Sequence, residues 1–477
     1  MGESMKKFLK SLVLIFIILP ATFFLTACGT PTVVNIEKTN TTDNMVIYTI
    51  YYSDGKTSSI TIENGKDGKS IDVEALYQLG VSKGFYTDDL NGYQKFLTDL
   101  MNNNENAITT NAGVSKALQS VVSVYAKFQT SSGSVFSSSA NEVMGGSGVI
   151  YKMEAEYSYI ITNYHVLYDN NASNSTKRAD AVYIYQYGVD KTLTTSGNNY
   201  VFGGGAVECT YIGGSMNYDI AVLRAKTSDL VKHNANVRAV DVATGYSVSQ
   251  DVYAIGNPQL EGLSVTKGII SVESETVRIT AADETTEIGY RLLRMDTAIN
   301  GGNSGGGLFD ENGNLVGIVN AKLVYVDSEN TPAEGISYAI PFDTATRVAD
   351  NLMHYYDIQK TFTPVLRLTL GISYQSLNSK QVYDPLTGKV KIEDQIVVAI
   401  APSYGTIASE MNLQKDDIVT AFTINDKTYQ LSRSFDLGNL LLEVRAEDVI
   451  AISYVRDGVT YTTGAHTVLS TELNKIY

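Results

Sequence analysis

A histidine, an aspartate and a serine in this sequence are placed where they could act together in nucleophilic catalysis. His165 ends a β-like run and precedes an irregular segment, so its side chain could face a cleft. Asp219 begins an otherwise apolar strand, and Ser304 lies in the glycine-rich run GGNSGGG. A serine hydroxyl needs an adjacent base to become a good nucleophile at neutral pH, and a buried carboxylate holds that base in the right tautomer. We therefore predict that these three residues form a catalytic site.

The glycines around Ser304 meet a second requirement of this chemistry, the stabilisation of negative charge on an oxygen atom. An oxyanion hole needs backbone N–H groups that point to one spot, and we expect side chains at Gly301 or Gly302 to obstruct such a turn. Read alone, the glycine run is also typical of a flexible loop. The presence of His165 and Asp219 upstream favours the catalytic interpretation.

The elements that must position these residues are short β runs. From about residue 117 to residue 339, apolar runs alternate with clusters of Gly and Asn, and a helix is expected at residues 344–356. Many short strands in one stretch are typical of a β-barrel or sandwich pair. The 39 Gly and 32 Tyr of the chain likewise favour a β-rich fold over a helical bundle.

Six short segments, in this order along the chain, resemble trypsin-like serine proteases and most closely their HtrA (Deg) branch. Three of them carry the site: GGSGVI leading to ITNYHVL at residues 145–167, YDIAVL at 218–223, and GGNSGGGL at 301–308. The others are AIGNP at 254–258, TKGIIS at 266–271 and GISYAIP at 335–341. The order His, Asp, Ser is that of chymotrypsin. The resemblance implies a chymotrypsin-like double β-barrel and a serine endopeptidase that works through an acyl-enzyme.

The resemblance also assigns roles to further residues around the nucleophile. The oxyanion donors would be the amides of Gly302 and Ser304. Ala298 would lie at the base of the S1 pocket, which receives the substrate side chain before the cleaved bond. The substrate strand would pair beside an apolar run that comprises Ile318, Val319, Asn320 and Ala321.

The residues around Ala298 predict the specificity of this pocket. Neither Ala298 nor its neighbours Thr297 and Ile299 carry a charge. A substrate Lys or Arg would be buried there without a partner, whereas a small aliphatic side chain would gain about 1.5–3 kcal/mol by leaving water. We therefore expect cleavage after residues such as Val, Ile or Ala, which are buried in folded proteins and exposed in unfolded ones.

Two departures from the trypsin-like pattern bear on regulation. Chymotrypsin-like zymogens carry Asp just before the nucleophile, where this chain has Asn303, as HtrA proteases do. Activation by a newly cut N-terminus is therefore not expected, and control would come from the ordering of loops. The stretch between His165 and Asp219 is longer than HtrA sequences usually have, which implies an inserted hairpin or long loop near the cleft.

The final part of the chain, residues 363–477, resembles a PDZ domain. Leu370, Gly371 and Ile372 match the loop that receives a peptide C-terminus, and residues 405–419 match the helix, turn and strand before the second half. Such a domain adds a peptide as a strand and holds its carboxylate on backbone amides. Without its neighbour, this segment would also fit a small β domain of another kind.

The first residues have the features of an export signal. Three lysines at positions 6, 7 and 10 precede an apolar segment at residues 12–25. The segment ends in LTAC, which resembles the lipobox of bacterial lipoproteins and implies cleavage before Cys28 and lipid on its thiol. The alternative is an uncleaved membrane helix, but residues 11–27 contain a proline and are short for a span.

Between this signal and the protease lies a stretch that we expect to be a small α+β module. Thr and Asn dominate residues 29–44, which predicts a tether. A hairpin is expected at residues 46–62, and short helices at 71–79 and 88–101. The expected organisation is therefore a signal peptide (1–27), the N-terminal module (28–112), the protease domain (113–358) and the PDZ-like domain (363–477).

Charge and composition exclude several other functions. The net charge of −15 disfavours binding to DNA or RNA. Four His and two Cys leave little material for a metal site, and no metal or other cofactor is expected.

The expected partners are unfolded polypeptides, peptide C-termini at the PDZ-like domain and a membrane that holds the lipid anchor. Because HtrA proteases are commonly trimers, the resemblance also implies a homotrimer.

The leading functional hypothesis is an HtrA-type endopeptidase that acts on misfolded or unfolded proteins outside the cytoplasm, anchored to a bacterial cell membrane. One alternative is a peptide-binding chaperone whose protease site is idle. Another is a surface scaffold protein in which the N-terminal module is the active part. The intact set of His165, Asp219 and Ser304 favours the protease.

Overall fold

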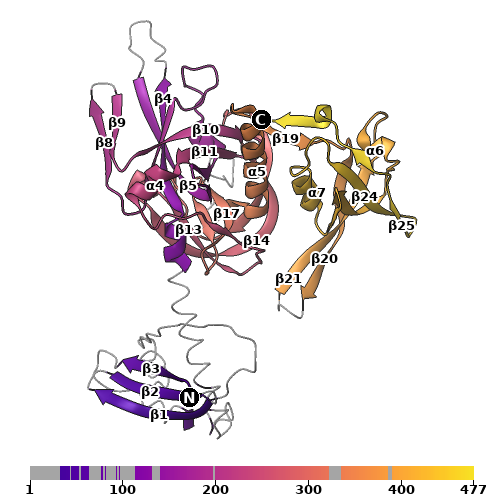
Figure 1. Ribbon diagram of the computed structural model, residues 1–477. Helices are drawn as coiled ribbons and strands as arrows, with labels where there is room; N and C mark the ends of the chain where they lie inside the picture. Colours follow the sequence, from indigo (N-terminus) through magenta and orange to yellow (C-terminus); the bar gives the residue numbers. More distant parts are fainter. Residues whose placement is uncertain are drawn as a thin grey trace. The chain divides into compact units, whose positions relative to one another are not determined.

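The computed structural model describes residues 33–42, 45–52, 55–63, 77–78, 81, 93, 96, 113–130, 140–196, 199–321, 335–384 and 389–477. The chain divides into two compact units, Met1–Thr110 and Asn111–Tyr477. β-strands make up most of the described residues (Figure 1), which confirms the expected mainly β fold class.

In the first unit, the described residues include a three-stranded antiparallel sheet in the order β1-β2-β3. The hairpin expected at residues 46–62 is present, and Gly55 at its turn has a φ of +79°. The tether expected at residues 29–44 is wrong in part, because most of it forms β1 and pairs with β2. The helices expected at 71–79 and 88–101 fall almost wholly outside the described residues. The strands are β1 (Val33–Thr42), β2 (Met45–Tyr52) and β3 (Thr57–Glu63).

The second unit contains a closed barrel of strands in the order β10-β11-β6-β5-β4-β7. Its interior is filled by buried apolar side chains such as Val124, Phe128 and Ile160. Glycine is required at Gly148 in β5, because a Cβ there would lie 2.7 Å from the Ile160 side chain. The strands are β4 (Val121–Thr130), β5 (Ala140–Met153), β6 (Tyr157–Thr162), β7 (Ala181–Gln186), β10 (Val207–Ser215) and β11 (Ile220–Lys226).

A separate hairpin, β8 (Lys191–Ser196) with β9 (Asn199–Gly204), stands beside this barrel (Figure 1). It lies between His165 and Asp219 in the sequence, so the inserted hairpin that the long spacing predicted is present. A short helix, α4 (Thr227–His233), follows β11.

The next seven strands form a second sheet in the order β12-β17-β16-β13-β14-β15-β18, and an additional β17–β18 pairing closes it into a ring. The expected double barrel is therefore confirmed. The strands are β12 (Asp241–Val242), β13 (Asp251–Gly256), β14 (Ser264–Thr280), β15 (Glu287–Met295), β16 (Gly307–Phe309), β17 (Asn314–Asn320) and β18 (Ser337–Pro341).

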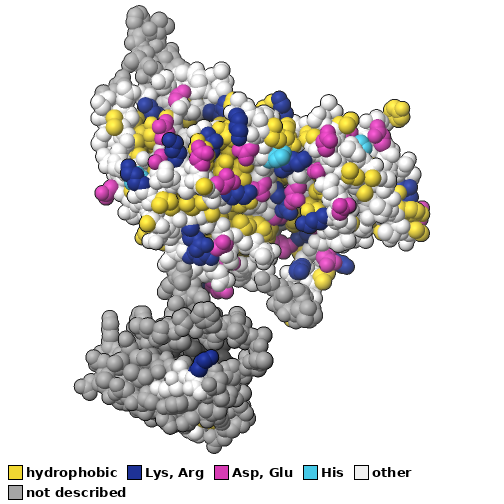
Figure 2. Space-filling model, in the orientation of Figure 1, with side chains coloured by type: hydrophobic (Ala, Val, Ile, Leu, Met, Phe, Trp, Pro, Cys, Tyr) yellow, Lys and Arg dark blue, Asp and Glu magenta, His cyan; other side chains and the backbone are white. Residues whose placement is uncertain are grey.

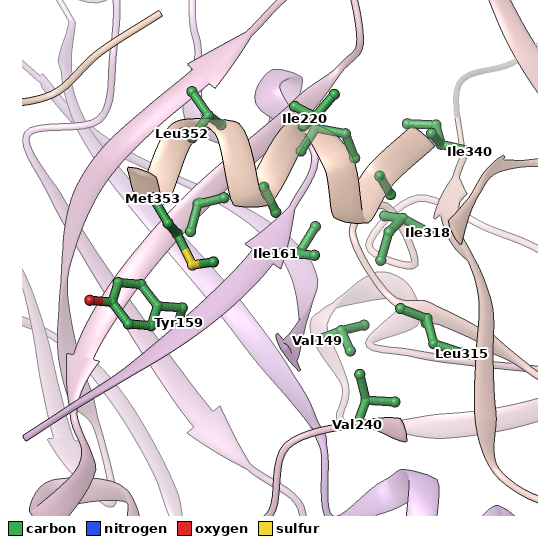
Figure 3. Close-up of a cluster of buried hydrophobic side chains, with 14 of the residues drawn as sticks. Val149, Tyr159, Ile161, Ile220, Val240, Leu315, Ile318, Ile340, Leu352 and Met353 are labelled. Carbon is green, nitrogen blue, oxygen red and sulfur yellow. The ribbon is translucent and has the colours of Figure 1, made fainter. Parts of the chain in front are cut away.

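The two barrels share a hydrophobic core with the helix α5 (Phe342–Gln359), which was expected at residues 344–356. Figure 3 shows Leu352 and Met353 on this helix, close to Ile161 and Ile220 of the first barrel and Ile318 of the second. All five side chains are buried. Burying an aliphatic side chain of this kind contributes about 1.5–3 kcal/mol relative to exposure, so this shared core fixes one barrel against the other.

The C-terminal domain is a small β domain with its own buried core. Its main sheet has the order β20-β21-β22-β24-β25, so β20 lies at an edge. Its strands are β19 (Val365–Leu368), β20 (Ser373–Asp384), β21 (Lys389–Ile400), β22 (Ile418–Ile424), β23 (Lys427–Gln430), β24 (Val449–Arg456), β25 (Val459–Thr462), β26 (His466–Thr467) and β27 (Leu473–Ile476), and its helices are α6 (Ile407–Glu410) and α7 (Ser434–Leu440).

Polar contacts join α5 to this domain. The fully buried Asn351 donates to the carbonyls of Leu366 (2.7 Å) and Leu442 (2.8 Å). Arg347 of α5 pairs with Glu443 at 2.5 Å. Figure 2 shows basic and acidic side chains interspersed over this face, as expected for surface ion pairs between neighbouring elements.

Candidate active site

The structure brings His165, Asp219 and Ser304 together between the two barrels. His165 lies in the 3₁₀ turn η1 (Tyr164–Leu167) after β6, Asp219 precedes β11, and Ser304 lies in the turn before β16. The Nδ1 atom of His165 is 2.7 Å from Oδ2 of Asp219, and its Nε2 atom is 2.8 Å from Oγ of Ser304. A continuous hydrogen-bonded path therefore runs from carboxylate to imidazole to hydroxyl.

The carboxylate of Asp219 is almost fully buried, and three donors satisfy it. Its Oδ1 accepts the backbone N–H of His165 at 3.0 Å, and its Oδ2 accepts Nδ2 of Asn320 at 2.9 Å in addition to the imidazole. Burial of a charge is tolerated only when hydrogen bonds or partners compensate it. These contacts therefore suit an ionised Asp219 and fix its orientation toward His165.

Sequence reasoning did not find this role for Asn320. It was expected to bind substrate, whereas its side-chain amide is directed to the Asp219 carboxylate. Only the three-dimensional approach of β17 to Asp219 brings the two residues together, and nothing in the local sequence signals it.

The loop that presents Asp219 is held from both sides. The hydroxyl of Tyr290 in β15 donates to the carbonyl of Met216 at 2.8 Å. From the C-terminal domain, Arg367 donates to the hydroxyl of Tyr218 at 2.9 Å. Because Asp219 itself has a left-handed φ of +49°, neighbouring contacts of this kind are needed to keep its backbone in place.

The turn at Gly301–Ser304 presents two backbone amides beside the Ser304 hydroxyl. Among the described residues, neither the amide of Gly302 nor that of Ser304 donates to another group. The Ser147 hydroxyl donates to the carbonyl of Gly302 at 2.8 Å, and Ser147 N–H donates to the carbonyl of Ser304 at 2.8 Å. The geometry therefore leaves both amides available to an oxygen atom of a bound group.

The two glycines expected to be essential at this turn differ. Gly302 has a φ of +97°, and a Cβ there would lie 2.2 Å from the carbonyl oxygen of Asn257. A Cβ at Gly301 would meet no atom within 4 Å. The expectation that a side chain would obstruct the turn therefore holds for Gly302 and is wrong for Gly301 in the free protein.

The expected substrate-binding residues fall into two groups. Ala298 is exposed in the segment that leads to the Ser304 turn, and its carbonyl accepts a hydrogen bond from Thr266. Ile318 and Val319, however, are fully buried. On one side Ile318 pairs with β16 and Val319 with the turn before β16, and on the other side both residues pair with β18. The expected pairing of a substrate strand with Ile318 and Val319 is therefore wrong, because no edge is left for it.

Ala321 lies just beyond the end of β17, and its amide is 3.2 Å from Oγ of Ser304. Asn320 and Ala321 are thus the part of this run that reaches the nucleophile. The next described residue is Gly335.

In the C-terminal domain, Leu370, Gly371 and Ile372 form the loop that enters the edge strand β20. Gly371 has a φ of +78°, and a Cβ there would lie 2.4 Å from the side chain of Thr406. The carbonyl of Leu370 accepts the amide of Ala408 in α6 at 2.9 Å, so the loop is held against that helix.

Three further expectations concern the lipid-bearing cysteine, a membrane-spanning helix and a metal site. Cys28 lies outside the described residues. Of the helices that are described, none is long and apolar enough to cross a membrane. Within the same part of the chain, no group of three or more His, Cys, Asp or Glu is placed to hold a metal ion.

Comparison with known proteins decides the family. Residues 146–318 match the model of the trypsin-like peptidase domain. The serine protease Do-like HtrA of Lactococcus lactis subsp. cremoris (strain MG1363) is 30% identical over 387 residues, which cover 77% of this chain and 84% of that protein. The chain belongs to the HtrA family of serine proteases. It is a serine endopeptidase.

Another relative and one solved structure also align with about three quarters of this chain. The serine protease Do-like HtrA of Bacillus subtilis (strain 168) is 28% identical over 356 residues, covering 73% of this chain and 70% of that protein. A solved structure of the HtrA-type protease AlgW with a decapeptide covers 75% of this chain and 98% of that chain, with 23% identity and a TM-score of 0.46.

Proposed function

We propose that His165, Asp219 and Ser304 cleave peptide bonds of unfolded proteins through an acyl-enzyme. In the first step, His165 takes the proton of the Ser304 hydroxyl, and the oxygen attacks the substrate carbonyl carbon. The protonated His165 then gives this proton to the leaving amine. A water molecule, activated by the same imidazole, releases the acyl group from Ser304.

The observation that carries this proposal is the hydrogen-bonded path Asp219–His165–Ser304 beside two backbone amides that donate to no other group in the described part of the chain. Negative charge develops on the carbonyl oxygen in the transition state, and the amides of Gly302 and Ser304 would donate to it there. Asp219 would stabilise the imidazolium cation that forms when His165 holds the proton.

A fluorophosphonate probe tests this assignment directly. We expect it to phosphonylate Ser304 of the wild-type protein, as identified by mass spectrometry, and to leave Ser304→Ala unlabelled. Casein digestion run beside it distinguishes the protease from a chaperone with an idle site. Labelling of another serine, or digestion that persists in Ser304→Ala, would contradict the proposal.

We propose that the S1 pocket is apolar and takes small aliphatic side chains. The residue at its base, Ala298, is uncharged and exposed. The nearest carboxylate in the sequence, Asp296, is directed to β14, where it accepts the amide of Ile269 at 2.7 Å. Ala298 and its neighbours Thr297 and Ile299 carry no charge, so the burial of a substrate cation against them would be unfavourable. Substrate would pair beside Ala321, the end of the run that lies next to Ser304.

A peptide-library digest measures this specificity. We expect dominant cleavage after Val, Ile or Ala, and a shift toward Lys and Arg in Ala298→Asp. Dominant cleavage after Lys or Arg by the wild-type enzyme would show that the pocket assignment is wrong. Because these aliphatic residues are buried in folded proteins, this specificity would select unfolded chains.

We propose that the C-terminal domain is PDZ-like and binds peptide C-termini at the loop of Leu370, Gly371 and Ile372. Support comes from the left-handed backbone at Gly371 and from the position of β20 at the sheet edge, where a peptide can add as a strand. The amides of this loop would receive the terminal carboxylate.

Fluorescence anisotropy with a peptide library tests this binding. We expect peptides with a free C-terminal carboxylate to bind and their amidated counterparts to lose most of that binding. Gly371→Val should abolish binding, because its Cβ would meet Thr406. Gly458→Val is the matched control, since Gly458 has a similar φ of +77° but lies in the β24–β25 turn with no atom near a Cβ. Equal binding of amidated peptides would contradict the proposal.

We also propose that lipid on Cys28 anchors the protein to the outer side of the bacterial cell membrane. The support is the sequence alone: a basic start, an apolar segment and the lipobox-like LTAC. We expect Cys28→Ala to move from the membrane fraction to the soluble fraction, with its protease activity retained. If that variant stays in the membrane after a carbonate wash, the segment is an uncleaved helix instead.

A further inference from the structure

The inserted hairpin β8–β9 contacts a loop that lies beside the Ser304 turn. Lys191 is the first residue of β8, and its Nζ atom donates to the carbonyl of Leu260 at 2.5 Å and to the hydroxyl of Tyr125 at 3.2 Å. The Tyr125 hydroxyl is also 3.2 Å from Nδ2 of Asn257. Lys191 thus connects the insertion directly to Leu260 and, through the Tyr125 hydroxyl, to Asn257. These are the two ends of the segment Asn257–Leu260.

The backbone of this segment is in a conformation that needs external support. Gln259 and Leu260 have φ values of +53° and +65°, in the left-handed region that disfavours residues other than glycine. Such residues are unfavourable in this conformation and persist only where their surroundings hold them. The carbonyl of Leu260 comes directly after this pair. It accepts the Lys191 ammonium at 2.5 Å and, more weakly, the Tyr125 hydroxyl at 3.4 Å.

The same segment contacts the Ser304 turn directly. The amide of Gln259 donates to the carbonyl of Gly301 at 2.9 Å. The amide of Asn257 donates to the Ser147 hydroxyl at 2.8 Å, which in turn donates to the carbonyl of Gly302 at 2.8 Å. The segment therefore holds the carbonyls of two successive residues of the turn.

These contacts determine the direction of one oxyanion donor. The carbonyl of Gly301 and the N–H of Gly302 belong to one peptide group, which is planar and trans. Their directions are therefore opposite. When Gln259 holds the Gly301 carbonyl on its side, the Gly302 N–H must point the other way, toward the site beside Ser304. A rotation of this peptide would break the bond from Gln259 and remove the donor.

We propose that Lys191, from the insertion between His165 and Asp219, is a positioning residue for the oxyanion hole. It holds the strained segment Asn257–Leu260, which holds the Gly301–Gly302 peptide with its N–H toward the substrate oxygen. This inference rests on the proposed role of the Gly302 amide.

The test compares Lys191→Met with Lys232→Met. Both variants remove one positive charge from an exposed lysine near the first barrel, but Lys232 lies on α4 and has no contact with the Asn257–Leu260 segment among the described residues. We expect Lys191→Met to lower kcat about tenfold with KM nearly unchanged, a smaller loss than the roughly 10²–10³-fold reported when a whole oxyanion donor is removed. Lys191→Arg, which keeps a donor, should recover most of the activity.

Two readouts separate positioning from general destabilisation. Active-site titration with a fluorophosphonate gives kcat per active molecule, so a fraction that fails to fold does not count. A peptidyl trifluoromethyl ketone forms an oxyanion on binding to serine, so its affinity should fall in parallel with kcat, whereas the affinity of a product peptide should not change.

A second variant keeps the inference testable if Lys191→Met folds poorly. Gln259→Gly retains the donating amide and relieves the left-handed strain at this position, one of the two in the segment. In that background, Lys191→Met should have a much smaller effect. Equal kcat values for Lys191→Met and Lys232→Met, or an unchanged effect in the glycine background, would overturn the inference. Failure of the wild type to label at Ser304 would instead overturn the proposed mechanism.

Discussion

Replacement of Ser304, His165 or Asp219 by Ala is expected to lower kcat for peptide hydrolysis by about 10⁴–10⁶-fold. The distances explain why each loss is so large. With Ser304 absent there is no nucleophile, and without His165 the Ser304 hydroxyl loses the ring nitrogen at 2.8 Å that takes its proton. Without Asp219, the imidazole loses the carboxylate at 2.7 Å that sets its tautomer. An internally quenched peptide with an aliphatic residue before the cleaved bond provides the measurement.

The double variants of this set are expected to lose little more than the single ones, because the three side chains act as one unit. His354→Ala is a matched control, since His354 is exposed on α5 and should leave kcat unchanged. Near-additive losses in the double variants would mean that the residues act independently, which contradicts the assigned mechanism.

Much of the fold and the triad could be predicted because their signals are local. The runs around His165, Asp219 and Ser304 each encode a strand end or a turn. Such short motifs can be recognised in the sequence without knowing which distant segments they contact. Alternating apolar residues likewise predict strands wherever one face is buried. The mainly β class follows from these patterns and the double barrel from the resemblance to trypsin-like proteases, and the structure confirms both.

The remaining features depend on contacts between distant segments. Ile318 and Val319 look like any apolar strand, and only the pairing with β18 shows that their second edge is occupied. Asn320 meets Asp219 across 101 positions of sequence. β1 has a composition typical of a tether, yet it pairs with β2. In each case the partner, which the local sequence does not specify, decides the role.

The turn before the nucleophile provides the second large expected effect. Gly302→Ala is expected to lower kcat by roughly 10²–10³-fold, with a much smaller change in KM. Gly302 has a φ of +97°, a conformation that an L side chain rarely adopts, and its Cβ would lie 2.2 Å from the carbonyl oxygen of Asn257. Backbone atoms cannot move aside as the end of a side chain can, so the turn itself must shift, and the Gly302 amide moves with it.

Gly301→Ala is the control for this experiment. Gly301 adjoins Gly302 and undergoes the same chemical change, but its Cβ would have open space and its φ is not in the left-handed region. We expect Gly301→Ala to keep kcat within about threefold of the wild type, because the Gly302 amide stays in place. Both variants should retain the wild-type circular dichroism spectrum, and fluorophosphonate titration should give kcat per active site. If the two variants lose activity equally, the Gly302 amide is not the donor that stabilises the oxyanion, since the steric difference between these positions would then have no consequence for the chemistry.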